Sequence, residues 1–218
     1  MDKKLLSKSE AAEYLKITES VIDEMISQKL FEVKTVGKNT RIDLASIDGW
    51  LESLNEQEVK DLAMKKTICR FREYFRPECI FLDFEAKTKY EAIRIMSEKA
   101  KELKLVKDAR WLYEVVVARE ELVSTAVGNG VALLHPRHLH PTKIKKPTVL
   151  FGRCPEGVDF DAPDEEAVTL FFMLLLHDDK QHLFSLSYLS KIMLNDENIK
   201  ILNATNDLDQ IHSLLAEI

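Results

Sequence analysis

The sequence predicts a layered α/β domain over residues 77–218, preceded by a small helical module at residues 1–54. Beyond residue 77, apolar runs and amphipathic helical patterns alternate, which is typical of a layered α/β fold. A charged segment, residues 55–76, separates this region from the N-terminal module. The 218 residues are 45% hydrophobic and 31% charged, the composition of an ordinary globular protein with ample material for a core. We therefore expect two domains and a linker.

The N-terminal module begins with a helix-start signal, the capping box Ser7-Lys8-Ser9-Glu10. Thr18 is a good N-cap for a second helix, whose apolar residues recur at helical spacing. Residues 31–36 and 40–43 flank a Gly-Lys-Asn turn and predict a hairpin. A last helix closes the module, which gives the order helix, turn, helix, hairpin, helix.

The linker, residues 55–76, is rich in charge but contains a weak apolar stripe through Val59, Leu62 and Ala63. This pattern allows a solvated linker helix or a helix that pairs subunits into a homodimer. Both interpretations stay open at this point.

The second region alternates predicted strands and helices. The expected strands span residues 80–84, 131–134, 147–152 and 168–176, and the expected helices span residues 89–105, 111–121, 180–194 and 206–217. The strand at 168–176 is apolar at every position but one, as in a strand buried on both faces.

Composition and length exclude several classes of protein. The longest apolar run, residues 167–176, is well short of the roughly 20 residues that a membrane span needs. No secretory signal follows the N-terminal lysines, and three scattered cysteines form neither a disulfide framework nor a metal pair. The net charge of −6 does not favour nucleic-acid binding by the chain as a whole. We expect a cytoplasmic protein that does not associate with membranes.

The most distinctive stretch runs from residue 128 to residue 137, where a short apolar strand ends on His135-Pro136-Arg137. A histidine presented by a strand at an exposed turn can carry a phosphoryl group, because a neutral imidazole attacks without a separate base. The alternative is a surface histidine in a loop. Charge builds up on the phosphoryl oxygens during transfer, so cations and donors should surround the site. The candidates for this role are Arg119, Ser124, Thr125, Gly130 and Arg137.

This stretch resembles the phosphorylation site of the mannitol/fructose-type enzyme IIA proteins. They belong to the bacterial phosphoenolpyruvate-dependent sugar phosphotransferase system and include its nitrogen-related regulatory branch. Their pattern runs Arg-Glu, then Ser-Thr-Gly, then Gly-Ile-Ala-Ile-Pro-His-Gly/Ala-Arg/Lys, and a second histidine precedes a leucine-rich helix. The matching residues here are Arg119-Glu120, Ser124-Thr125, Gly130, His135, Arg137 and His182-Leu183. Ala126, Leu134 and Pro136 depart from the pattern.

The resemblance implies a mixed sheet flanked by helices, with His135 accepting a phosphoryl group from the phosphocarrier HPr or a relative. It implies that His182 and Arg119 assist, and that an enzyme IIB or another protein is the target. The different-class alternative keeps the fold as a protein- or DNA-binding regulatory module that is not phosphorylated. We expect no cofactor, since the chain lacks a Gly-x-x-x-x-Gly-Lys loop, and no metal, since no carboxylate or cysteine supports the nearby histidines.

Residues 5–52 resemble the excisionase-like helix-turn-helix domain, which implies a small winged fold and DNA as the ligand. The predicted wing offers Lys34, Lys38 and Arg41 as phosphate contacts. Against this, the second helix carries Glu19, Asp23 and Glu24, and residues 1–66 hold 11 Lys+Arg and 13 Asp+Glu. DNA affinity comes largely from cations that neutralise phosphates. A protein-interaction or dimerisation module is therefore an equal alternative.

Overall fold

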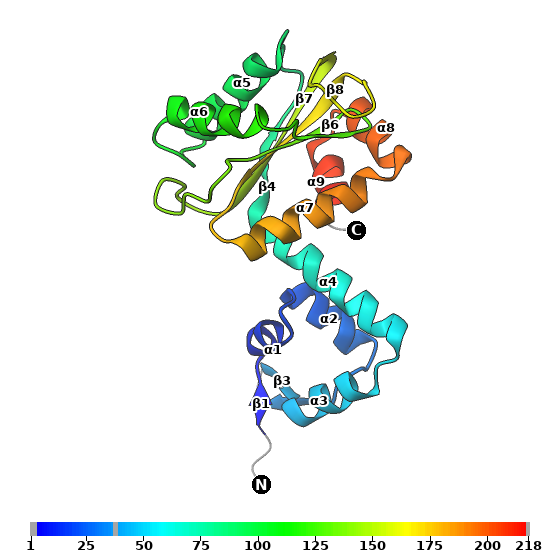
Figure 1. Cartoon of the computed structure of the whole chain (residues 1–218). Coiled ribbons are helices and arrows are strands. Elements are labelled where there is room, and N and C mark those ends of the chain that lie inside the picture. Colours follow the sequence, from blue (N-terminus) through cyan, green and yellow to red (C-terminus); the bar gives the residue numbers. More distant parts are fainter. Residues whose placement is uncertain (1–3, 37–38, 217–218) are drawn as a thin grey trace. The chain divides into compact units, whose positions relative to one another are not determined.

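Two units, Met1–Arg70 and Phe71–Ile218, make up the computed structural model, which describes residues 4–36 and 39–216 (Figure 1). The first unit contains β1 (Leu5–Leu6), α1 (Lys8–Leu15), α2 (Glu19–Ser27), β2 (Val33–Val36), β3 (Asn39–Asp43) and α3 (Leu44–Ser53). The helix α4 (Glu56–Tyr74) begins in the first unit and ends in the second.

The predicted element order of the first unit is confirmed, with one addition. The capping box is present: the Ser7 hydroxyl accepts from the Glu10 amide at 3.2 Å, and the Glu10 carboxylate accepts from the Ser7 amide at 2.7 Å. Thr18 occupies the N-cap position of α2, but its side chain makes no capping hydrogen bond. The strand β1, which pairs with β3, was not predicted, because two residues are too short to show a periodicity.

The predicted linker is helical over Glu56–Tyr74, and one face of it is not solvated. Leu62 and Cys69 are buried in the apolar core of the first unit, whereas Val59 is exposed. Strand β4 starts directly after the helix, five residues before the predicted strand at 80–84. Part of the predicted apolar stripe is therefore buried against the N-terminal unit.

The second unit is a five-stranded mixed sheet with helices on both faces, as predicted (Figure 1). Its strands are β4 (Phe75–Phe81), β5 (Ala126–Gly128), β6 (Val131–Leu134), β7 (Thr148–Val158) and β8 (Val168–Leu175), in the order β4-β7-β8-β6-β5. Its helices are α5 (Lys89–Glu102), α6 (Ala109–Glu120), α7 (Asp179–Met193), α8 (Asp196–Ala204) and α9 (Leu208–Ala216). Helices α5 and α6 cover one face, and α7, α8 and α9 cover the other.

The alternation of side chains along the central strands separates two apolar layers. Leu150 and Met173 belong to the cluster formed with α5 and α6. Phe151 and Phe172, the next residues on each side of this register, pack together with ring centroids 5.0 Å apart on the opposite face. Because both faces of β7 and β8 are covered, these strands are apolar at nearly every position.

Two elements of this unit were not predicted, the strand β5 and the helix α8. The strand has three residues, and α8 buries only Leu202, so neither leaves a strong periodic pattern. Among the described residues, no helix is both long and apolar enough to cross a membrane.

Candidate functional site

The candidate site lies where two neighbouring parallel strands end. Strands β6 and β8 pair in parallel, with Leu134 opposite Met173, so their carboxyl ends meet at the same edge of the sheet. His135 follows β6 directly, and His182 lies in the first turn of α7, which follows β8. The two imidazole rings meet edge to face, with centroids 4.6 Å apart and planes at 63°. The structure thus brings the two sequence-predicted histidines together.

One nitrogen of the His135 ring is fixed by the backbone. Its Nδ1 lies 3.0 Å from the carbonyl oxygen of Pro136. A carbonyl oxygen can only accept, so Nδ1 carries the hydrogen and donates it. In the neutral ring this arrangement leaves the lone pair on Nε2, which is the nucleophilic nitrogen of this tautomer.

Burial keeps both rings uncharged. The pKa of His135 is lowered to about 4, chiefly by burial and to a smaller extent by His182 and Arg119, while the hydrogen bond to Pro136 acts in the opposite direction. The pKa of His182 is also lowered, chiefly by burial and then by Arg119, with Asp179 acting in the opposite direction. Near pH 7 both imidazoles are therefore neutral, and that of His135 is available for attack.

Arg119 lies in the last turn of α6 and acts on both histidines through its charge. Its Nη1 donates to the carbonyl oxygen of Val123 at 2.7 Å. This partner is neutral, so the guanidinium keeps its full positive charge beside the two rings. Arg137 is exposed two residues after His135.

The two hydroxyl groups predicted near the phosphoryl group have internal partners. Ser124 Oγ donates to the carbonyl oxygen of Phe160 at 2.5 Å. Thr125 Oγ1 and the Thr125 amide both donate to Oε2 of Glu120, at 2.5 and 2.8 Å. A hydroxyl has one hydrogen to give, and here each is given to an acceptor inside the protein.

Gly130 is not brought to this site. It precedes β6, whereas His135 follows it, so the five residues between them span about 16 Å at a rise of about 3.3 Å per residue. With φ of +69°, Gly130 forms the tight turn between β5 and β6, and its carbonyl accepts from the amides of Thr169 and Leu170. The glycine-rich turn therefore shapes the hairpin at the opposite end of the strand.

Sequence reasoning missed three features of the site. Glu120 is buried and holds Thr125, although it is half of the Arg-Glu pair that carried the resemblance. The Pro136 carbonyl fixes the ring of His135, and a backbone acceptor of this kind cannot be predicted from the pattern of side chains. Large apolar side chains are exposed next to the functional ones: Leu122, Val123, Leu183 and Phe184. Their positions shortly after Arg119-Glu120 and directly after His182 are the sequence feature that could have predicted this exposed apolar surface.

In the N-terminal unit, two of the three predicted wing cations lie on the described strands of the hairpin. Lys34 and Arg41 are register partners on β2 and β3, and Lys38 lies outside the described residues. Arg41 is 3.6 Å from the carboxylate of Glu10.

The acidic face of α2 has cationic partners within the same unit. Asp23 pairs with Lys8 at 2.5 Å, and Glu24 pairs with Lys65 at 3.1 Å. These carboxylates offset the positive charges that a DNA-binding surface needs.

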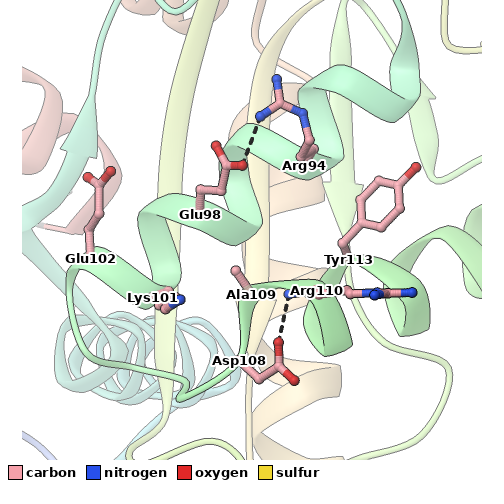
Figure 2. Close-up of a pocket in the computed structure, with 8 residues that line it drawn as sticks. All are labelled: Arg94, Glu98, Lys101, Glu102, Asp108, Ala109, Arg110 and Tyr113. Carbon is pink, nitrogen blue, oxygen red and sulfur yellow. Dashed lines mark hydrogen bonds and ion pairs between the residues drawn. The ribbon is translucent and has the colours of Figure 1, made fainter.

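A separate hollow lies between α5 and α6 (Figure 2). Its walls carry the Arg94–Glu98 ion pair, at 2.8 Å, and the Asp108 carboxylate that caps α6 by accepting from the Arg110 amide. Among the described residues that line this hollow, none is a sequence-predicted site residue. We therefore assign it no role in the candidate site.

Comparison with known proteins agrees with this geometry. Residues 73–218 match the family described as "Phosphoenolpyruvate-dependent sugar phosphotransferase system, EIIA 2", and residues 5–55 match "Helix-turn-helix domain". A nitrogen regulatory protein of Bradyrhizobium diazoefficiens is 33% identical over 142 residues, which cover 64% of this chain and 90% of that protein.

Two solved structures extend the likeness to the fold. The nitrogen regulatory protein IIA-Ntr from Neisseria meningitidis is similar with a TM-score of 0.59 and 31% identity, covering 66% of this chain and 97% of that one. Enzyme IIA for mannitol from Escherichia coli, solved in complex with phosphorylated enzyme IIB, has a TM-score of 0.59 and 26% identity, covering 66% and 99%. The chain therefore belongs to the EIIA 2 family of the phosphoenolpyruvate-dependent sugar phosphotransferase system and carries a helix-turn-helix domain at its N-terminal end.

Proposed function

We propose that this protein is a regulatory phosphocarrier that accepts a phosphoryl group on Nε2 of His135 from the phosphocarrier HPr or a relative. The observation that carries the proposal is the ring geometry of His135. Its Nδ1–H is held by the Pro136 carbonyl at 3.0 Å, and a second neutral imidazole lies 4.6 Å away. The buried, uncharged ring offers one nitrogen lone pair in a fixed direction.

The proposed step is a displacement at phosphorus. The Nε2 lone pair of His135 forms a bond to phosphorus while the donor's phosphorus–nitrogen bond breaks, and the donor nitrogen keeps the bonding pair. His135 loses no proton, because Nδ1–H stays with the Pro136 carbonyl. The phosphorylated ring then carries a positive charge, which this hydrogen bond stabilises until the group moves to the next acceptor.

Arg119 and His182 would stabilise the charge on the phosphoryl oxygens. The guanidinium of Arg119 has a neutral partner, the Val123 carbonyl, and can attract an incoming anion without losing an ion pair. His182 is neutral and can donate from one ring nitrogen. Both are positioned before the phosphoryl group arrives, which is the condition for effective electrostatic stabilisation.

The surface beside these residues favours a protein as the donor. Leu122, Val123 and Leu183 are 54, 70 and 69% exposed, and they follow Arg119 and His182 in sequence. Exposed apolar side chains next to a charged centre are typical of a surface that docks another protein. The family also includes a member solved in complex with enzyme IIB, so a IIB-type protein is a candidate target here.

In this proposal the helix-turn-helix domain is the regulatory output. The phosphorylation state of His135 alters what that domain binds, either DNA through its wing or a protein partner. Support comes from the helix-turn-helix match and from the nitrogen regulatory proteins among the relatives.

Phosphoryl transfer to the full chain tests the proposal. We expect labelled phosphoenolpyruvate, enzyme I and HPr to transfer an acid-labile, base-stable phosphoryl group to the protein, and His135→Ala to abolish it. His138→Ala is the matched control, since His138 is an exposed histidine three residues away. Label that persists in His135→Ala would move the site elsewhere. An unlabelled wild-type protein would favour the binding module that kept the enzyme IIA fold.

A further inference from the structure

We propose that Glu120 and Thr125 are positioning residues, which lock the loop after α6 so that the Val123 carbonyl holds the Arg119 guanidinium beside His135. The inference rests on the proposed function, since it assigns a task to residues that support Arg119. It names two residues that act through Arg119 and do not themselves touch the phosphoryl group.

The lock is a single carboxylate oxygen that closes the loop. Oε2 of Glu120 accepts from both the amide and the hydroxyl of Thr125, at 2.8 and 2.5 Å. Glu120 is only 2% exposed, and Thr125 is also buried. Two donors from one residue converge on a single buried oxygen, so they tie Thr125 firmly to the end of α6.

Inside this loop, the residue that anchors Arg119 has no packing of its own. The side chains of Leu122 and Val123 are 54 and 70% exposed, so burial does not fix the Val123 carbonyl. Its position depends on the loop ends, where Thr125 is tied to Glu120 and Ser124 donates to the Phe160 carbonyl. Release of the Thr125 tie would therefore loosen the loop and shift the carbonyl that holds Arg119.

Thr125 also connects the loop to the strand that presents His135. The amide of Leu133 donates to the carbonyl oxygen of Thr125 at 3.0 Å, two residues before His135. Three hydrogen bonds thus connect Arg119 to the strand before His135. The Arg119 guanidinium donates to Val123, Thr125 donates to Glu120, and the Leu133 amide donates to Thr125. This short series sets the distance between the charge and the reacting ring.

A purely structural role explains Glu120 poorly. Its second oxygen, Oε1, is buried and makes no hydrogen bond within the part of the chain described. A buried charged group with an unsatisfied atom costs stability, and an apolar side chain would close a helix end without that cost. The presence of a carboxyl group with one unbonded oxygen at this position is better explained by the conformation that Glu120 imposes on the loop.

The test compares Thr125→Val with Thr125→Ser in the full-length protein. Valine keeps the shape and the amide but removes the hydroxyl donor, whereas serine keeps both donors. We expect Thr125→Val to slow phosphoryl uptake from HPr about 10- to 100-fold, the effect of a small misplacement of a supporting group, and Thr125→Ser to remain near wild type. Glu120→Gln, which weakens the same tie, should also slow uptake.

Epistasis with Arg119 separates positioning from stability. In an Arg119→Ala background, Thr125→Val should change the rate less than about twofold, because the group that it positions is gone. By NMR, Thr125→Val should also raise the pKa of His135, since the guanidinium charge that lowers it is no longer held nearby. Equal slowing by Thr125→Val with and without Arg119 would overturn the inference, as would an unchanged rate in Thr125→Val. Failure of the wild-type protein to take up phosphoryl groups would instead overturn the proposed function.

Discussion

The two units differ in what holds the cations of their proposed phosphate-binding surfaces. In the N-terminal unit, Arg41 of the predicted wing lies 3.6 Å from the carboxylate of Glu10. In the second unit, Arg119 rests on a backbone carbonyl. An incoming phosphate must displace a carboxylate in the first case and nothing charged in the second. The difference indicates that the second unit is prepared for a phosphoryl group, while the first would bind DNA only weakly.

Removal of Arg119 should have the largest effect among the supporting residues. We expect Arg119→Ala to slow phosphoryl uptake at His135 by about 10²–10³-fold, the cost of losing one preorganised charge-stabilising group. Arg110→Ala is the matched control, because Arg110 lies on the same helix and is neutralised by Glu114 at 2.9 Å. The measurement is the initial rate of labelling with HPr as donor. Equal labelling rates for the two variants would show that a neutral hydrogen-bond partner does not make Arg119 a better phosphate-binding group than an arginine paired with a carboxylate.

His182 differs from Arg119 in that its imidazole is neutral, so we expect it to stabilise the phosphoryl group less strongly. We expect His182→Ala to accept a phosphoryl group on His135, but about 10²-fold more slowly, at the low end of the same range. The phosphorylated form should also hydrolyse faster than that of the wild type. Single-turnover labelling followed by a chase measures both rates. A His182→Ala protein with no uptake at all would mean that His182 itself carries the phosphoryl group.

The charge of Arg119 should also be visible in the titration of His135. NMR of the imidazole should give a pKa of about 4 for His135, against the ordinary value of 6.5, and Arg119→Ala should raise it. The unfolded chain takes up this proton first, so the histidine lowers the free energy of unfolding as the pH falls from 6.5 toward 4. Above that window the ring is neutral and this contribution is constant. A midpoint near 6.5 in the folded protein would contradict the burial of a neutral ring.

Much of this architecture follows from local patterns in the sequence. Alternating apolar runs and helical patterns predict a layered α/β domain, and the capping box of Ser7 and Glu10 predicts the start of α1. The meeting of His135 and His182 was implied by the family motif, and the parallel pairing of β6 with β8 gives its physical cause. Strand ends that share an edge bring together residues 47 positions apart, since 182 − 135 = 47.

What escaped prediction depends on contacts between distant or backbone atoms. Gly130 is close to His135 in sequence, yet the strand between them separates the two. The hydroxyl of Ser124 is given to a carbonyl 36 residues away, so its partner is set by tertiary structure. The sequence near Arg41 does not identify its partner, but the fold places the carboxylate of Glu10 beside it. Residue type shows which groups can bind phosphate, and the fold decides which of them are already engaged.

The smallest expected effect concerns the N-terminal unit, where Arg41 of the predicted wing has a carboxylate partner. With about three wing cations, log K for DNA should fall by roughly 2.7 per tenfold rise in salt, at about 0.9 per phosphate neutralised. The variant Lys38→Ala/Arg41→Ala should reduce that slope to about 0.9. Binding to genomic fragments across a salt series measures both values. A steep slope that this double variant leaves unchanged would show that the wing is the wrong surface.

The ion pair between Arg41 and Glu10 allows a direct test of whether a carboxylate partner weakens phosphate binding by a cation. Glutamine can replace the capping-box glutamate, so Glu10→Gln removes the negative charge beside Arg41 while it keeps the start of α1. Because an exposed ion pair contributes little, this change should strengthen DNA binding only slightly, by less than about tenfold. Ser9→Ala, a neutral change on the same helix, is the control. If Glu10→Gln binds no better than the wild type, the carboxylate does not restrain Arg41. If neither protein binds DNA at low salt, residues 5–55 act on protein partners, and the neutralised cations are part of that surface.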